Sequence, residues 1–501
     1  MQKNILAIDQ GTTGTKVLIM DTELRALAEQ STPFEQHFPK PGWVEHDLNQ
    51  IWVSVTQGIV SVTKKVNSKT IAAIGITNQR ETICFWHKAT LEPLAKALVW
   101  QDRRTAARCE ELRGQGWLPF VQQKTGLLLD PYFSATKLEW MLAHNEDVKS
   151  ALKAGVLAVG TIDTYLLARL TGGFSFATEP SNASRTLLFN LEQKKWDPDL
   201  LKLFQVPEEI LPQVLPTFAH FGVTKGVREL PDGIPITGMI GDQQSALLGQ
   251  ACIEKGQAKC TFGTGAFLLM NTGTEIKRSQ HQLLTTVAWA MSEDQSTGRN
   301  KIGAVTYALE GSAFMAGATF QWLRDGLGMI ERADQLEALA LQVQDSGGVF
   351  LVPAFTGLGA PYWDPHARAS LSGLTRGSTR AHIARAALEG VAFQNGDILK
   401  AMESDLGQRL EFLNVDGGAC KNNLLMQIQS DVLQCKLNRP RFTETTSLGA
   451  IFAAGMGANV WTSLNEIKKV WKCEREFLPQ ISPAVAEERD RKWQDAVRRV
   501  R

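Results

Sequence analysis

Short apolar runs that alternate with polar or glycine-rich turns predict strands through much of the chain. Before residue 250 these runs cover residues 5–8, 17–20, 71–76, 82–86, 156–159 and 234–240. Apolar residues at helical spacing predict helices over residues 51–65, 136–142 and 163–170. Strands that feed helices through glycine-rich turns are typical of α/β folds, which bind ligands at the ends of their strands.

The same alternation restarts after Gly249, so we expect an N-terminal domain over residues 1–250 and a C-terminal domain over residues 251–501. In the second half, strands are predicted over residues 260–270, 284–290, 349–352 and 412–415. Helices are predicted over residues 311–327, 382–402 and 423–433. The polar residues 291–301 predict an exposed loop.

A Gly/Thr-rich turn between two apolar strands occurs once in each half. The first copy reads ILAIDQGTTGTKVLIMD (residues 5–21), and the second reads AKCTFGTGAFLLMN (residues 258–271). Glycine permits the tight turn, and successive backbone N–H groups in such turns bind anions. Either copy alone is best explained as an ordinary hairpin turn. The duplication, together with Asp9 at the mouth of the first turn, favours a polyphosphate gripped from both halves.

Composition and charge exclude several classes of protein. A formal charge of +1 gives no electrostatic case for binding nucleic acid or an anionic membrane surface. No apolar run approaches the ~18 residues of a membrane span. The cysteines form no C-x-x-C pair, so we expect reduced thiols and a cytoplasmic location. The sequence also lacks G-x-x-x-x-G-K-[ST], a complete G-x-G-x-x-G and H-E-x-x-H, which disfavours P-loop enzymes, Rossmann dehydrogenases and zinc hydrolases.

Phosphoryl transfer requires a phosphate cradle, a metal holder and a group that accepts the proton of the nucleophile. The predicted cradle and its compensating cation are Thr12, Thr13, Gly14, Thr264, Gly265 and Lys16. Asp9 closes a strand at the first turn and is the candidate Mg²⁺ ligand. Asp242 directly follows the strand over residues 234–240, a position equally typical of a proton acceptor and of a helix N-cap.

Other polar and aromatic residues are candidates for the site of the second substrate. Arg80 and Glu81 lie in TNQRET after the strand over residues 71–76, which predicts either contacts to a polyhydroxylated substrate or a solvated turn. The aromatic residues that predict either an apolar pocket wall or ordinary core are Trp100, Tyr132 and Phe267. DGGA (residues 416–419) precedes Asn422 and a helix, which fits either a nucleotide contact or a plain turn.

Several of these segments resemble motifs of the sugar-kinase/Hsp70/actin superfamily. IDQGTT (residues 8–13), TFGTG (261–265) and DGGA resemble its first phosphate, second phosphate and adenosine motifs, and TSLGAIFAAG (446–455) resembles its second connecting helix. PYFSATKLEW (131–140) and the segment from SLSGLTRG to ALEG (370–390) resemble the two signatures of the FGGY carbohydrate kinases. The segments most similar to glycerol-phosphorylating members are PKPGWVEHD (39–47), GITNQRET (75–82), VWQDRRT (99–105), GDQQSALLGQ (241–250) and PAFTGLGAPYWDP (353–365).

This resemblance implies a ribonuclease-H-like fold in each half and transfer of the γ-phosphate of ATP to a terminal hydroxyl of glycerol, with Mg²⁺ as cofactor and Asp242 as general base. The residues implied to line the glycerol pocket are Arg80, Glu81, Trp100, Tyr132, Asp242, Gln243 and Phe267. The residues implied to meet the nucleotide are Thr12, Thr13, Gly14, Lys16, Thr264, Gly317, Gln321, Gly418 and Asn422. We also expect a homodimer or homotetramer.

One departure from the family pattern concerns the phosphates, because Lys16 stands where arginine is frequent and lysine cannot form a bidentate phosphate contact. Two alternative functions stay open at this point. One is an FGGY kinase that acts on a ketose or a sugar acid. The other is a non-kinase ATPase of the superfamily, such as a chaperone-like or filament-forming protein.

Overall fold

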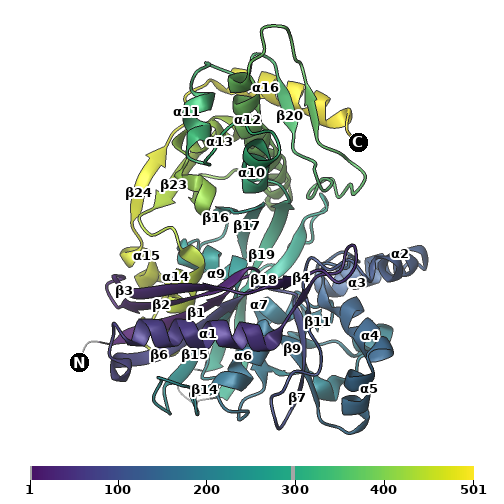
Figure 1. Cartoon of the computed structure of the whole chain (residues 1–501), viewed down its shortest axis with the longest axis vertical. Helices are drawn as coiled ribbons and strands as arrows, with labels where there is room; N and C mark the ends of the chain where they lie inside the picture. Colours follow the sequence, from purple (N-terminus) through teal and green to yellow (C-terminus); the bar gives the residue numbers. More distant parts are fainter. Residues whose placement is uncertain (1–2, 295–298) are drawn as a thin grey trace.

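The computed structural model describes residues 3–294 and 299–501 and contains one large sheet in each half of the chain (Figure 1). The N-terminal sheet has the order β14-β15-β6-β1-β2-β3. Its strands are β1 (Asn4–Gln10), β2 (Gly14–Asp21), β3 (Ala26–Pro33), β6 (Ile71–Asn78), β14 (Gly222–Val223) and β15 (Pro235–Gly241). The C-terminal sheet has the order β18-β19-β17-β16-β22-β23-β24. Its strands are β16 (Ala258–Phe262), β17 (Ala266–Gly273), β18 (Leu284–Asp294), β19 (Arg299–Ala313), β22 (Phe412–Asp416), β23 (Lys436–Pro440) and β24 (Cys473–Phe477).

The two sheets repeat the same strand topology. In the first, β3, β2 and β1 are successive antiparallel neighbours, and β6 and β15 continue the sheet in parallel with β1. In the second, β19, β17 and β16 are antiparallel neighbours, and β22 and β23 continue in parallel with β16. The duplicated turn of the sequence lies at the equivalent place in both, between β1 and β2 and between β16 and β17. The expected two-domain α/β fold is therefore confirmed.

Helices and a third sheet complete the N-terminal half. The third sheet joins β4 (Gln36–His37), β5 (Glu45–His46), β7 (Ile83–His87), β8 (Ala97–Leu98) and β9 (Leu157–Thr161). Two short ribbons pair β10 (Ala177–Thr178) with β13 (Gln213–Val214) and β11 (Phe189–Asn190) with β12 (Lys195–Trp196). The helices are α1 (Leu48–Thr63), α2 (Ala106–Gly114), α3 (Leu118–Thr125), α4 (Ser134–His144), α5 (Glu146–Lys153), α6 (Ile162–Leu170), α7 (Pro180–Ala183), α8 (Pro198–Leu203) and α9 (Asp242–Gly249). Asp47 caps α1 by accepting from Asn49 N and Gln50 N, so the amphipathic helix begins where a capping carboxylate is available.

The long helix α12 dominates the C-terminal half. Its start is fixed by a capping box between Thr379 and His382, and its end by Gly407 in the left-handed conformation (φ 70°). The helices of this half are α10 (Gly317–Asp325), α11 (Gln335–Ala340), α12 (Arg380–Leu406), α13 (Asn423–Leu433), α14 (Thr445–Gly457), α15 (Leu464–Val470) and α16 (Pro483–Arg498), and the ribbon β20 (Phe350–Val352) with β21 (Ser370–Ser372) lies beside them. The described residues also form 3₁₀ turns: η1 (Ser68–Thr70) and η2 (Glu208–Ile210) in the N-terminal half and η3 (Gly418–Lys421) in the C-terminal half.

Helix α14 links the two halves. Although it comes late in the chain, it packs on β1, β6 and β15 of the N-terminal sheet and against α9, and Figure 1 shows it beside the purple strands. The two helices approach closely because glycines face each other. A Cβ atom on Gly249 would lie 2.0 Å from Thr445 O, and one on Gly449 would lie 1.9 Å from Ser245 O. The domain boundary near residue 250 stays a prediction, since this contact crosses it.

Two predicted elements in the C-terminal half are wrong in part. Residues 311–313 end strand β19 rather than begin a helix, and α10 starts only at Gly317. The predicted loop over residues 291–301 is strand at both ends, because β18 continues to Asp294 and β19 begins at Arg299; residues 295–298 lie outside the described part. A long hairpin satisfies its polar backbone by pairing, so polar side chains alone did not indicate a loop.

Candidate active site

The parallel strands bring the predicted site residues of the N-terminal half to one edge of the sheet. Strands β1, β6 and β15 are parallel neighbours, so their carboxyl ends meet there. The first Gly/Thr turn follows β1, Arg80 and Glu81 follow β6, and Asp242 follows β15. In the C-terminal sheet, β16 and β22 are likewise parallel, so the second turn and Gly418 leave neighbouring strands at the same edge.

The first turn is held tightly by its own backbone. Gly11 N donates to Gly14 O (2.9 Å), which leaves Thr12 half-buried and Thr13 exposed. A Cβ atom on Gly14 would lie 2.9 Å from Thr32 O on β3, so the adjacent strand requires glycine at this position. The two threonines are the side chains that this turn offers to a ligand.

The second turn has the same construction and is seated on helix α10. Gly263 N donates to Gly265 O (2.9 Å), and Thr264 is exposed at the tip. Gly317 N donates to Gly263 O (3.0 Å), and Ala316 N donates to Thr264 O (2.8 Å). The predicted nucleotide residues on this turn and at the start of α10 are therefore in direct backbone contact.

Asp9 and Lys16 face each other in the β1–β2 register at the base of the first turn. Ser447 Oγ donates to Asp9 Oδ2 (2.8 Å), and Lys16 Nζ forms an ion pair with Glu444 (2.5 Å). Burial raises the pKa of Asp9 to about 7; the Ser447 hydrogen bond lowers it, and the charge of Asp242 raises it further. The ammonium group of Lys16, which the sequence predicts to contact a phosphate, is therefore already paired with the carboxylate of Glu444, the residue before α14.

Asp9 fits one role in a magnesium site. Among the described residues, no group of three or more His, Cys, Asp or Glu side chains is arranged to hold a metal ion. Mg²⁺ is nevertheless commonly bound by one or two protein carboxylates, with substrate phosphates and water completing its octahedron. Burial and the nearby Asp242 carboxylate disfavour the ionised form of Asp9, and a cation bound next to Asp9 stabilises that form.

Arg80 is buried, and its guanidinium group contacts three side chains. Its Nη1 donates to Glu310 Oε2 (2.5 Å) and to Gln244 Oε1 (3.2 Å), and its Nη2 donates to Glu310 Oε1 (3.0 Å). Its Nε lies 3.1 Å from Asp242 Oδ1. Of the two sequence interpretations, the solvated turn is wrong, because the side chain of Arg80 is only 2% exposed.

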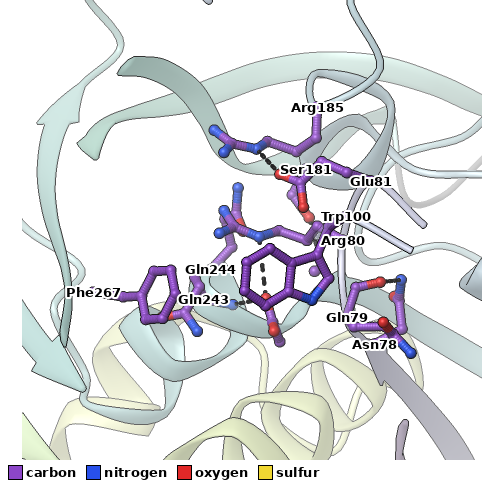
Figure 2. Close-up of polar contacts among 12 residues, drawn as sticks. Asn78, Gln79, Arg80, Glu81, Trp100, Ser181, Arg185, Gln243, Gln244 and Phe267 are labelled. Carbon is purple, nitrogen blue, oxygen red and sulfur yellow. Dashed lines mark hydrogen bonds and ion pairs between the residues drawn. The ribbon is translucent and has the colours of Figure 1, made fainter. Parts of the chain in front are cut away.

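Glu81 is held next to Arg80 by an unusual backbone conformation and by a second arginine. Its φ of 61° turns the chain sharply, so that Thr82 N donates to Arg80 O (2.7 Å). Arg185 Nε donates to Glu81 Oε1 (2.6 Å), as the dashed line in Figure 2 marks. A non-glycine residue in this backbone region is strained, and such strain is concentrated at functional sites.

Asp242 opens helix α9 with one carboxylate oxygen occupied. The N-cap is Gly241, so the alternative that Asp242 is the N-cap is wrong by one residue. Asp242 Oδ1 accepts from Gln243 N (2.7 Å) and faces Arg80, and the side chain is 26% exposed. Burial raises the pKa of Asp242, while Arg80 and the Gln243 N–H lower it. A carboxylate of raised pKa that reaches solvent can accept a proton.

Aromatic residues lie beside these polar groups. The Trp100 and Tyr132 rings meet edge to face with centroids 5.6 Å apart. Lys137 Nζ donates to Val99 O (2.8 Å), directly before Trp100, and to Tyr132 O (3.1 Å). These two bonds hold the backbone of both aromatic residues in place. Phe267 on β17 comes from the other half of the chain, and its ring is drawn to the left of Trp100 in Figure 2.

Gln243 was implied to contact glycerol, but its side chain has a protein partner. Lys259 Nζ donates to Gln243 Oε1 (2.5 Å) and to Thr261 Oγ1 (2.8 Å). Lys259 is fully buried on β16, and burial lowers its pKa. The amide of Gln243 is therefore oriented by the C-terminal sheet.

The predicted adenosine side has one open position. Gly417 has φ 84°, and a Cβ atom there would lie 2.5 Å from Phe262 O, so glycine is required. A Cβ atom on Gly418, by contrast, would meet nothing within 4 Å. Asn422 Oδ1 accepts from Leu425 N (2.8 Å) and caps α13, and Gln321 is exposed on α10.

Sequence reasoning missed several side chains at the site: Arg185, Gln244, Lys259, Glu310, Glu444 and Ser447. Two of them carried a usable signal. Lys259 is the one charged residue of β16, and Glu310 is the one charged residue in the largely apolar part of β19 over residues 302–313. A buried charge requires a partner. The partners of Glu310, Arg80 and Arg185, lie more than a hundred residues away in the chain, so their pairing was not predictable.

Comparisons with known proteins agree with this architecture. The N-terminal domain of the FGGY family of carbohydrate kinases matches residues 4–249, and its C-terminal domain matches residues 258–458. A glycerol kinase of Myxococcus xanthus is 52% identical over 500 residues, covering 99% of both chains. A glycerol kinase of Halalkalibacterium halodurans is 48% identical over 499 residues, covering 99% of this chain and 98% of its own.

Solved structures give the same result. The crystal structure of Plasmodium falciparum glycerol kinase with ADP has a TM-score of 0.92 at 37% identity, covering 100% of this chain and 98% of that chain. Gluconate kinase of Lactobacillus acidophilus has a TM-score of 0.87 at 23% identity, covering 99% of this chain and 96% of its own, which shows a shared fold alone. The two family matches span most of the chain, and this chain belongs to the FGGY family of carbohydrate kinases.

Proposed function

We propose that this chain is a glycerol kinase, which transfers the γ-phosphoryl group of ATP to a terminal hydroxyl of glycerol and forms sn-glycerol 3-phosphate. Relatives that carry this name are 52% and 48% identical to it over nearly their whole length. The observation that carries the choice of a small polyol is the arrangement of Arg80, Glu81 and Asp242 at one sheet edge. These groups supply N–H donors and carboxylate acceptors beside an aromatic pair, as a short chain of hydroxyl groups requires.

In this proposal Asp242 is the general base. Its Oδ1 is engaged by Gln243 N and Arg80, which leaves Oδ2 to take the proton of the attacking hydroxyl. The glycerol oxygen forms a bond to the γ-phosphorus as the bond from that phosphorus to the bridging oxygen of ADP breaks. Arg80 donates to a second hydroxyl, and Glu81 accepts from the third. Trp100, Tyr132 and Phe267 pack against the carbon chain.

The phosphates are proposed to lie between the two Gly/Thr turns. Thr12, Thr13, Gly14 and Lys16 serve from the first, and Thr264 serves from the second. The proposed nucleotide contacts beyond the phosphates are Gly317, Gln321, Gly418 and Asn422. Asp9 is proposed to hold Mg²⁺, which when bound offsets the charge of the phosphate oxygens. For Lys16 to reach a phosphate, it must exchange its ion pair with Glu444 for the ligand.

A substrate panel tests this function. ADP release is followed by a coupled assay with glycerol, 1,2-propanediol, xylulose and gluconate, each over a range of concentrations. We expect glycerol to have the highest kcat/KM. Propanediol lacks one hydroxyl and leaves a buried polar group unpaired, a mismatch that can lower kcat/KM by up to ~10⁴-fold.

The possible results separate the candidate functions. A higher kcat/KM for xylulose or gluconate would replace glycerol with a sugar while keeping the kinase chemistry. ADP release that no acceptor accelerates would instead favour a superfamily ATPase that is not a kinase.

We also propose that the protein works in the cytoplasm as a homodimer or homotetramer without a nucleic-acid partner. The formal charge of +1 supports the last point, because phosphate backbones are bound by strongly basic surfaces. Within residues 3–294 and 299–501, no helix is both long and apolar enough to cross a lipid bilayer. Sedimentation velocity over a range of protein concentrations measures the size of the assembly.

A further inference from the structure

Glu310 joins the two halves of the molecule at the proposed glycerol site. It lies on β19 of the C-terminal sheet and is fully buried. Its carboxylate accepts from two arginines of the N-terminal half: from Arg80 Nη1 (2.5 Å) and Nη2 (3.0 Å), and from Arg185 Nη2 (3.1 Å). A single side chain of one half thus binds two cations of the other.

This contact fixes the orientation of the Arg80 guanidinium. Three of its five N–H groups are used by Glu310 and Gln244, which leaves the Nε–H and one Nη2–H for other partners. The stem of the side chain lies over Gly241, where a Cβ atom would come within 2.9 Å of both Cγ and Cδ. Arg80 is therefore held along its length, with Nε beside Asp242 (3.1 Å).

The same carboxylate reaches Glu81 through Arg185. Arg185 donates to Glu310 with Nη2 and to Glu81 with Nε (2.6 Å). Its rigid guanidinium group therefore bridges the two carboxylates and fixes the distance between them. Figure 2 shows Arg185 extending over Glu81, next to Arg80. Arg80 and Glu81, which are proposed to bind the two hydroxyls that are not phosphorylated, therefore both depend on one acidic residue from the opposite half.

A contribution to stability alone does not explain the buried ion-pair cluster of Arg80, Glu81, Arg185 and Glu310. Arg185 Nη1 is buried and has no hydrogen-bond partner among the described residues, and such a group destabilises the folded state. Buried ion pairs are in general weak stabilisers, because desolvation offsets their attraction. Although burial raises the pKa of Glu310, Arg185 and Arg80 hold it at about 2, so the residue stays ionised.

Glu310 also lies on the strand that leads to the nucleotide side. Strand β19 ends at Ala313, whose carbonyl oxygen lies 2.6 Å from the place of a Cβ atom on Gly265. Three residues later, Ala316 N donates to Thr264 O (2.8 Å). The position of Glu310 is thus tied to the second Gly/Thr turn by a short stretch of strand.

We propose that Glu310 is a positioning residue for the proposed glycerol site: it orients Arg80 directly and Glu81 through Arg185, and it ties both to the half that carries the second phosphate turn. This inference rests on the proposed function and assigns to Glu310 no contact with substrate. Its signature is a defect in acceptor binding that is larger than the defect in nucleotide binding.

The test is Glu310→Gln, which keeps the shape of the side chain and removes its charge. Hydrogen bonds to charged groups are strong enough that we expect KM for glycerol to rise about tenfold to a hundredfold. KM for ATP should change by no more than about twofold, because the Gly/Thr turns retain their backbone contacts. Glu310→Asp, which restores the charge on a shorter side chain, should recover part of the loss.

Asp397→Asn is the matched control. Asp397 is also a buried carboxylate of the C-terminal half, but it binds Trp493 and Gln494 of α16 and not the site. It should lower thermal stability and leave KM for glycerol unchanged. If Glu310→Gln does not fold, Arg185→Lys decides, since it keeps a cation near Glu310 but cannot bridge both carboxylates; it too should raise KM for glycerol selectively.

Two results would overturn the inference. One is a Glu310→Gln enzyme with KM for glycerol within twofold of wild type. The other is an equal rise in both KM values, as expected from general loosening. Failure of the proposed function is separate from these results, because the wild-type enzyme would then not phosphorylate glycerol at all. In that case the same variants are measured with the best acceptor of the panel, and an unchanged KM for that acceptor overturns the inference.

Discussion

The indole Nε1 of Trp100 donates a hydrogen bond of 2.9 Å to the hydroxyl oxygen of Thr12. Trp100 belongs to the proposed wall of the acceptor pocket, and Thr12 belongs to the first phosphate turn. Trp100 N also donates to Oγ1 of Thr82 (3.3 Å), the residue directly after Glu81. The two sites are therefore connected by a contact that neither motif indicates by itself.

A double-mutant cycle of Trp100→Phe and Thr12→Val measures this connection. Phenylalanine keeps an aromatic wall without the donor, and valine keeps the shape of threonine without the acceptor. We expect each single change to lower kcat/KM for ATP, and the pair to show a coupling energy of about 0.5–1.5 kcal/mol, typical of one hydrogen bond. Strictly additive effects would mean that Thr12 acts on the nucleotide independently of Trp100.

Asp242→Asn tests the proposed base. Removal of a general base typically lowers the rate by ~10² to 10⁴-fold, and asparagine retains an oxygen for the Gln243 N–H and for Arg80. We expect kcat to fall by that amount while the Kd of an ATP analogue, measured by calorimetry, stays within a few fold. A variant with nearly wild-type kcat would contradict the assignment and direct attention to a water-mediated route.

Much of the fold was predictable because its elements are strongly patterned. The strand over residues 71–76 and the helix over residues 423–433 were found in place, since a continuous apolar run and a helical apolar stripe leave few alternatives. The long hairpin of β18 and β19 was missed in part. Its polar residues satisfy the backbone by pairing with each other, a non-local effect that local composition does not carry.

The sequence predicted the site residues that directly follow strands, but it did not predict the ion pairs between the two halves. Asp9, Arg80 and Asp242 stand directly after or at the ends of apolar runs, and parallel pairing gathers such positions at one edge. The pairing of Glu310 with Arg80 and Arg185 became visible only in the structure, because these partners lie more than a hundred residues away in the chain. Buried ion pairs between the halves depend on packing that no sequence spacing encodes.

Asp9→Asn tests the proposed magnesium ligand. Because Mg²⁺ prefers charged oxygen ligands, the amide should raise the Mg²⁺ concentration needed for half-maximal activity by about tenfold or more. Excess Mg²⁺ should restore part of the rate. Asp163→Asn is the control: it is a buried carboxylate bound to Thr161 and Thr178, and its Mg²⁺ titration should match wild type. An unchanged titration for Asp9→Asn would place the metal elsewhere.

The carboxylate of Asp397 gives the stability of the C-terminal half a specific pH dependence. Burial raises the pKa of Asp397 to about 6, against hydrogen bonds from Trp493 and Tyr362 that lower it; Asp490 raises it and Lys400 lowers it. Between pH 4 and 6 the folded state binds a proton that the unfolded state does not, so stability falls as pH rises through this window. The shift from the usual 3.8 corresponds to about 3 kcal/mol.

We therefore compare thermal unfolding of wild type and Asp397→Asn from pH 4.5 to 8. The difference in Tm between them should be largest in favour of wild type at low pH and should shrink or reverse above pH 6. Parallel curves would mean that Asp397 keeps the same protonation state on unfolding.

Gly417 and Gly418 are adjacent, but we expect the fold to require glycine at the first position and the nucleotide to require it at the second. A Cβ atom on Gly417 would lie 2.5 Å from Phe262 O, in a backbone conformation (φ 84°) that disfavours side chains. Gly417→Ala should therefore lower Tm by several degrees or abolish folding. A Cβ atom on Gly418 would meet no protein atom within 4 Å, so Gly418→Ala should leave Tm unchanged.

If the nucleotide lies against Gly418 as proposed, the added methyl group must compete with it for space. We expect Gly418→Ala to raise KM for ATP by about tenfold, equivalent to about 1.4 kcal/mol of binding free energy. KM for glycerol should not change, because Arg80 and Asp242 lie at the edge of the other sheet. A methyl group that leaves KM for ATP as it was would show that this turn, although open, is not where the nucleotide binds.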